Sequence, residues 1–74
     1  MNTVQVNIPN CDYYVASMLR GLAFKFGARA SETTTEKFLE MNGYVEYLFK
    51  SEVRAKQFRE AVTLYLPKFA KVIT

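Results

Sequence analysis

The side chains that most often do chemistry are scarce in this chain of 74 residues. It has one cysteine, Cys11, and no histidine. Without histidine there is no imidazole to act as a general base or to carry a proton at neutral pH. A single thiol cannot form an internal disulfide, and Cys/His zinc sites need more ligands than these. The composition therefore predicts no catalytic residue, no cofactor and no metal.

The acidic residues do not supply an alternative catalytic centre. Glu36 and Glu40 are four positions apart, and on a helix two such carboxylates repel each other mildly. The chain has no glycine-rich phosphate loop and no nucleophile in a recognisable context. We therefore expect a protein that is not an enzyme. The seven acidic residues are spread over the chain: Asp12, Glu32, Glu36, Glu40, Glu46, Glu52 and Glu60.

The surroundings of Cys11 resemble one known family. In the heavy-metal-associated domain a Cys-x-x-Cys loop joins a strand to a helix, and residues 7–15 (NIPNCDYYV) are similar in placement. Cys11 stands at the first ligand position, and Tyr14 occupies the second. A soft metal ion is held by two thiolates, so the resemblance does not carry metal binding to this chain. We expect Cys11 to be a residue packed at a loop.

The charge of the chain is mildly positive. Ten basic and seven acidic residues give a net charge of +3. Six of the basic residues follow Tyr47, where only Glu52 and Glu60 are acidic. This distribution fits a solvated helix face, and it also fits a surface that contacts phosphates. The residues that would make such contacts with nucleic acid are Arg54, Lys56 and Arg59.

Residues 3–27 predict a strand followed by a helix. Apolar residues alternate with polar ones over residues 3–8, which is typical of a half-buried strand, and Pro9 ends it. Asn10 or Asp12 can begin a helix that runs to about Phe26, and Gly27 fits the position after its last turn. Apolar residues at helical spacing form the buried stripe of that helix. They are Val15, Met18, Leu19, Leu22 and Phe26.

Residues 28–43 allow two interpretations. Alternation over residues 28–35 predicts an edge strand, and the pair Asn42-Gly43 is typical of a hairpin turn. Thr33 followed by Glu36 also resembles a capping box, and Gly43 could end a short helix. We prefer the hairpin, while a short helix over residues 34–42 remains the alternative.

The last third of the chain predicts a strand, a helix and a final short strand. Residues 44–49 (YVEYLF) are rich in side chains that favour sheets. Ser51 is a good first residue for a helix that extends to about Leu66, where Pro67 ends it. Residues 71–74 form the last strand. The inner stripe of the helix contains Ala55, Phe58, Ala61, Val62 and Tyr65.

The order strand, helix, strand, strand, helix, strand predicts a single α+β domain over residues 1–74 with the ferredoxin-like plait. In that fold two helices cover one face of one antiparallel sheet, and the other face stays open. The residues expected to face the helices are Val4, Val6, Ile8, Val45, Tyr47 and Phe49. Those expected on the open face are Gln5, Asn7, Tyr44, Glu46 and Leu48.

The element order and the stretch at residues 42–49 (NGYVEYLF) also resemble the RNA-recognition motif. That family stacks bases on exposed aromatic rings of its two central strands. Here Glu46 stands at the central stacking position and Gln5 at the aromatic position of the first strand. Only Tyr44 matches, so recognition of RNA by base stacking does not carry over.

Aromatic residues supply the remaining indication of function. Five tyrosines and six phenylalanines exceed what the core of so small a domain holds. Exposed aromatic residues are typical of protein interfaces. We therefore predict a small interaction module, most simply a homodimer that buries its open sheet face or an edge strand. A lone thiol and the lack of a signal peptide favour the cytoplasm, and no membrane partner is expected. The predicted interface residues are Tyr13, Tyr44, Glu46 and Leu48.

Overall fold

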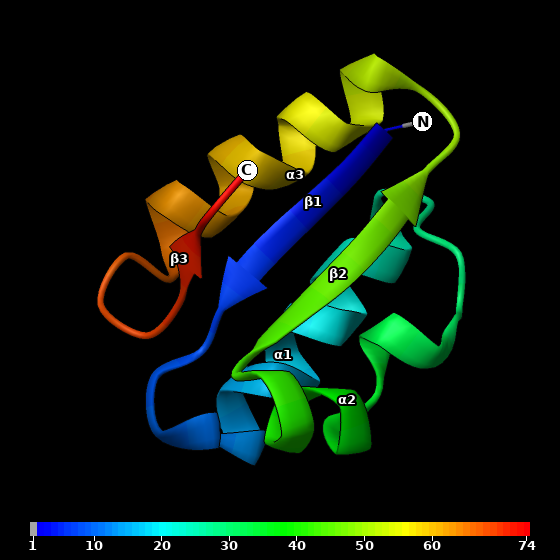
Figure 1. Ribbon diagram of the computed structural model, residues 1–74. Coiled ribbons are helices and arrows are strands. Elements are labelled where there is room, and N and C mark those ends of the chain that lie inside the picture. The colour runs from blue at the N-terminus through cyan, green and yellow to red at the C-terminus, as the bar shows by residue number, and fades with distance from the viewer. Residues whose placement is uncertain (1) are drawn as a thin grey trace.

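A computed structural model describes residues 2–74 and shows an α+β architecture, with one antiparallel sheet and helices packed on it (Figure 1). Three strands, three α-helices and two short 3-10 helices occur in these residues. The elements are β1 (Asn2–Asn7), η1 (Pro9–Cys11), α1 (Tyr13–Lys25), η2 (Glu32–Thr34), α2 (Glu36–Asn42), β2 (Tyr44–Phe49), α3 (Glu52–Tyr65) and β3 (Lys71–Val72).

Strand β1 lies in the middle of the sheet, in the order β2-β1-β3. It pairs antiparallel with β2 over its whole length, so that Val4 lies opposite Tyr47. It also pairs antiparallel with β3, where Val6 lies opposite Val72. Because side chains of paired residues point to the same face, this register separates a buried row from an open row.

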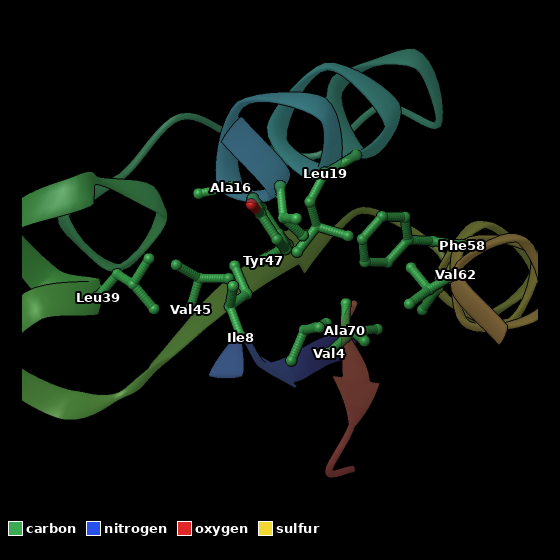
Figure 2. Packing of buried hydrophobic residues seen from close by; sticks show 14 of the residues in the cluster. Val4, Ile8, Ala16, Leu19, Leu39, Val45, Tyr47, Phe58, Val62 and Ala70 are labelled. Atoms are coloured by element: carbon green, nitrogen blue, oxygen red, sulfur yellow. The ribbon is translucent and has the colours of Figure 1, made fainter. Parts of the chain in front are cut away.

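The buried row is the one that the alternation predicts. All six residues expected to face the helices are buried. Helices α1 and α3 pack on this row through Leu19 and Phe58 (Figure 2). The ring of Phe58 meets Tyr47 at 5.4 Å and Phe49 at 5.2 Å between ring centroids. Such aromatic contacts stabilise a core by about 1 kcal/mol each beyond the buried area.

The two long helices begin at the residues that the sequence predicts. The Asp12 carboxylate accepts hydrogen bonds from the backbone N–H groups of Tyr14 and Val15 at 2.9 and 3.3 Å. The Ser51 hydroxyl accepts one from Arg54 N–H at 3.2 Å. These bonds satisfy N–H groups that have no partner within the helix. The predicted starts of α1 and α3 are confirmed.

The predicted edge strand over residues 28–35 is wrong. Only Arg29 pairs with the sheet, through a hydrogen bond from its backbone N–H to the Leu48 carbonyl at 2.9 Å. The chain then forms η2, in which the Thr34 hydroxyl donates to the Ser31 carbonyl at 2.8 Å. Serine and threonine hydroxyls offer the backbone local partners and so compete with pairing in a sheet. The alternation of residues 28–35 is therefore not strand alternation.

The predicted hairpin at Asn42-Gly43 is also wrong, and the alternative helix is present as α2. The Thr35 hydroxyl accepts a hydrogen bond from Phe38 N–H at 3.2 Å, so Thr35 and not Thr33 caps this helix. Gly43 ends it in the left-handed region, with φ of 78°. Leu39 is fully buried and joins α2 to the core. The Thr35 cap, the left-handed Gly43 and the buried Leu39 together define the helix.

Two residues of the predicted helix stripes are exposed. Tyr65 keeps 69% of its surface and Met18 keeps 42%. Tyr65 is the last residue of α3, where the helix gives way to the turn before β3. No helix within residues 2–74 is both long and apolar enough to span a membrane.

Candidate interaction surface

The sheet has one face that no long helix covers (Figure 1). Both α1 and α3 pack on the opposite face, where the valines of β1 lie. The uncovered face, called the open face below, holds the residues that alternate with the core row, and each of those on β1 and β2 is half-buried. Lys71 pairs with Asn7 and therefore adds its side chain to the same face. The open face consists of Thr3, Gln5, Asn7, Tyr44, Glu46, Leu48, Lys71 and Ile73.

The middle of the open face is polar and ordered by hydrogen bonds. The Gln5 side-chain amide donates to one carboxylate oxygen of Glu46 at 2.8 Å. The Asn7 amide donates to the Gly43 carbonyl at 2.9 Å. A carboxylate has room for several hydrogen bonds, so the Glu46 carboxylate is positioned by Gln5 and can still accept others.

Apolar side chains surround this polar centre. Tyr44 makes an edge-to-face contact with Phe38 of α2, with ring centroids 5.5 Å apart. Leu48 is half-buried at the other end of β2, and Ile73 keeps 51% of its surface. A polar pair with its hydrogen bond made, flanked by aromatic and aliphatic side chains, is the composition of many protein interfaces.

The edges of the sheet are less available than its open face. On the outer side of β2, Arg29 N–H donates to the Leu48 carbonyl and the Thr33 hydroxyl donates to the Glu46 carbonyl at 2.7 Å. On the side of β1 that faces β3, the Arg59 guanidinium donates to the Thr3 carbonyl at 3.0 Å, at a position that β3 does not reach. Strand β3 itself has only two residues. These features satisfy or shorten the edges on which another strand would pair.

The structure brings together three of the four predicted interface residues. Tyr44, Glu46 and Leu48 all belong to the open face. Tyr13 does not, because it is the first residue of α1, which packs on the other side of the sheet. Its ring keeps 44% of its surface. The prediction for Tyr13 rested only on its absence from the buried stripe, which does not specify a face.

The three basic residues proposed for nucleic acid do not share one surface. Arg54 and Lys56 are two positions apart on α3, and a turn of 100° per residue directs them to nearly opposite sides of the helix. The Arg59 guanidinium is engaged within the chain, since it donates to the Thr3 carbonyl and, at 3.2 Å, to the Thr74 backbone oxygen. The role of Arg59 is therefore structural in this chain.

Five of the eleven aromatic residues are exposed, so the predicted surplus over the core exists. It is distributed over the helices and the turn before β3, and it is not concentrated on the open face. Phe24 lies beneath the Arg20 guanidinium, 5.2 Å from the ring centroid. The exposed aromatic residues are Tyr13, Tyr14, Phe24, Tyr65 and Phe69.

A small cavity lies between α1 and the segment formed by η2 and α2. Its volume is about 60 Å³, far below the 300 Å³ or more of ordinary metabolite pockets. Within residues 2–74, no three histidine, cysteine or acidic side chains gather in a way that would hold a metal ion. The cavity is lined by Ala16, Ser17, Arg20, Thr34 and Glu36.

The buried Tyr47 lies close to this cavity. Figure 2 shows its hydroxyl beside Ala16, and no hydrogen-bond partner for it occurs in the described part of the chain. Burial raises the pKa of the Tyr47 hydroxyl well above its usual value, and the charge of Arg20 opposes this shift only in part. A tyrosine in this state stays neutral and does not act as a base at neutral pH.

Two functional features of the surface were not found from the sequence. Phe38 supports Tyr44, and Arg59 covers the edge of β1, yet both act on residues distant in the chain. The sequence has no signal that links Phe38 to Tyr44 or Arg59 to Thr3 before the fold is known. Comparison with models of known families, with curated proteins and with solved structures finds no match for this chain.

Proposed function

We propose that this chain is a small non-catalytic assembly module that forms a homodimer through its open face. The observation that carries the proposal is the contrast between the two parts of the sheet. The edges are closed by Arg29, Thr33 and Arg59, while an ordered face with Tyr44 and Leu48 has no covering helix. A sheet buries an apolar face against another layer of structure, and a second copy of the chain can supply that layer.

We infer that the fold is a reduced form of the ferredoxin-like plait. In a plait the sheet order is fourth, first, third and second strand. Here β3, β1 and β2 follow one another in that way, and Arg29 pairs with β2 where the second strand would lie. This inference is supported by the position of the Arg29–Leu48 bridge, which forms on the side of β2 away from β1. A plait with so short a second strand has a narrower open face, which bears on the strength of any dimer.

The size of the open face predicts a weak dimer. Two six-residue strands about 20 Å long and the two-residue β3, spaced by about 4.8 Å, give a face of roughly 220 Å² in projection. Stable dimers bury about 800 Å² on each partner. Side chains at the border, such as Phe38 and Ile73, would have to join the contact. We therefore expect a dissociation constant in about the micromolar range, as for transient interfaces.

Paired substitutions test whether the open face carries the dimer. Leu48→Ser and Tyr44→Ala remove apolar contacts from this face and are expected to weaken dimerisation about tenfold or more. Leu64→Ser and Tyr13→Ala are matched controls, since both residues are exposed and lie on helices. Sedimentation velocity over a range of concentrations measures the effect. If the controls weaken the dimer and the open-face variants do not, the proposal is wrong.

The alternative function, binding of nucleic acid through α3, is distinguished by a separate measurement. Binding through phosphates predicts retention of DNA or RNA at low salt that falls steeply as salt rises. Arg54→Ala and Lys56→Ala probe nearly opposite sides of α3, so the one whose side chain contacts phosphate would weaken such binding and the other would not. Salt-dependent binding by a strictly monomeric chain would favour this alternative over self-association.

A further inference from the structure

We propose that two copies pack face to face with β2 of each over β3 of the other, so that Glu46 of each copy pairs with Lys71 of the second copy. This inference rests on the proposed dimer and specifies its geometry. The occupant of the open face is thus a second copy of this chain, recognised by opposite charges on the two outer strands of the sheet.

Two arrangements with two-fold symmetry bring a pair of open faces together. If the symmetry axis runs along the strands above β1, the lateral order of one sheet is reversed relative to the other, and β2 meets β3. If the axis runs across the strands, β2 meets β2 and β3 meets β3. Both keep β1 over β1, and both fit the aligned packing of sheets. Charge decides between them.

The register places the charges on opposite sides of β1. Glu46 lies next to Gln5 on the β2 side, and Ile73 bonds the Gln5 carbonyl on the β3 side. Lys71 lies next to Asn7, two residues before Ile73 in the chain and on the same face of the sheet. When β2 lies over β3, Glu46 of one copy faces Ile73 of the other, with Lys71 two residues away and within reach of a lysine side chain.

The same arrangement gives Lys71 a second contact. Tyr44 shares a row with Asn7 and Lys71, so the ring of Tyr44 lies under Lys71 of the second copy. The ammonium group then has the Glu46 carboxylate on one side and an aromatic ring on the other, and both attract a cation. Gln5 holds the carboxylate in place by its hydrogen bond at 2.8 Å.

The other arrangement is electrostatically unfavourable. With β2 over β2, the two Glu46 carboxylates approach each other between the sheets, where water screens them less than at a free surface. Lys71 lies in the row of Asn7 and Glu46 in the row of Gln5, so the two Lys71 ammonium groups oppose each other when the axis passes above Asn7, and the two carboxylates do so when it passes above Gln5. Like charges across an interface select against that partner orientation. The distribution of two charged residues thus favours one dimer over the other.

Charge reversal tests this geometry, and each variant is the control of the other. Glu46→Lys and Lys71→Glu are each expected to weaken the homodimer about tenfold or more, because both symmetry-related pairs become repulsive. An equimolar mixture of the two variants is expected to form a heterodimer with near wild-type affinity. The double variant E46K/K71E is expected to recover its homodimer. Sedimentation equilibrium and titration calorimetry measure these affinities, and Glu52→Lys controls for net charge.

The outcomes separate this inference from the proposed function. Recovery in the mixture and in the double variant supports the β2-over-β3 geometry. If the wild type dimerises but neither recovers, the geometry is wrong and the dimer stands. A different pair of results would place β2 over β2. In that case Lys71→Glu leaves the homodimer unchanged, and the heterodimer of Glu46→Lys with the wild type is tighter than the homodimer of either protein. A wild type that stays monomeric at about 100 μM overturns both proposals.

Discussion

At the scale of single residues, Tyr47 differs most from its neighbours in the core. It is fully buried, its ring packs edge-on against Phe58, and its hydroxyl has no partner within residues 2–74. A buried hydroxyl that loses its bonds to water and gains none in return lowers the free energy of unfolding by about 1–3 kcal/mol. The ring therefore stabilises the core while the hydroxyl destabilises it.

Tyr47→Phe tests this balance. The substitution removes the unpaired hydroxyl and keeps the ring, so we expect the free energy of unfolding to rise by about 1 kcal/mol. Urea denaturation followed by circular dichroism measures the change. Tyr44→Phe, on the half-buried open face, is the control and is expected to change stability by less. A loss of stability in Tyr47→Phe would mean that the hydroxyl has a partner, such as a bound water.

The same residue predicts instability at alkaline pH. Burial raises the pKa of Tyr47 in the folded chain, so the unfolded chain loses this proton first as the pH rises. Below about pH 10 the contribution to stability is fully present, and above it the free energy of unfolding falls by up to about 1.4 kcal/mol per pH unit. The thermal midpoint of the wild type is expected to drop above pH 10 more than that of Tyr47→Phe. Parallel curves for the two proteins would contradict this.

Arg59 is the residue whose predicted and observed roles differ most. It was a candidate for binding phosphates, and it instead holds the Thr3 carbonyl and the Thr74 backbone oxygen. Arg59→Ala is expected to lower the free energy of unfolding by about 1–2 kcal/mol, because the Thr3 carbonyl loses a charged donor. Arg54→Ala is the matched control, since the Arg54 guanidinium bonds the exposed Gln57 side chain, and it should change stability by about 0.5 kcal/mol or less. Equal effects of the two in urea denaturation would refute this role.

At the scale of elements, the strands whose apolar and polar residues alternate could be predicted from that alternation alone. Alternation over β1 and β2 specifies the core row and also places Tyr44, Glu46 and Leu48 on one face. The segment between α1 and β2 was not predictable by this means. Asn42-Gly43 satisfies a hairpin turn and a helix end equally well, because both need glycine with positive φ. In the folded chain the Thr35 cap, the left-handed Gly43 and the buried Leu39 all belong to the helix.

Two glycines test the ends and interior of the helices. Gly43 ends α2 with φ of 78°, a conformation that alanine adopts at a cost, so Gly43→Ala is expected to lower the free energy of unfolding by about 1 kcal/mol. Gly21 lies inside α1 on an exposed face, with open space where a Cβ would be placed. Gly21→Ala is therefore expected to raise stability by about 0.5–1 kcal/mol. Thermal and urea denaturation of the pair measure both signs, and a stabilised Gly43→Ala would contradict the observed end of α2.

At the scale of the whole molecule, the surfaces differ in how far the chain itself covers them. Arg29, Thr33 and Arg59 cover parts of the sheet edges, and the cavity beside α1, with a volume of about 60 Å³, is too small for a metabolite. The exposed aromatic residues are spread over the helices and the turn before β3. The open face is the extended surface that combines order, apolar area and charge. Its modest size limits the affinity expected of the proposed dimer, whose formation should therefore depend on concentration.

Sedimentation equilibrium of the wild type beside Leu48→Ser tests whether this chain associates with itself through the open face. The wild-type mass is expected to rise from monomer towards dimer between about 1 and 100 μM, while Leu48→Ser remains monomeric over the same range. Circular dichroism of Leu48→Ser serves as the control that tests whether the variant is folded. A wild type that stays monomeric throughout, or a folded Leu48→Ser that dimerises as tightly as the wild type, would contradict the account.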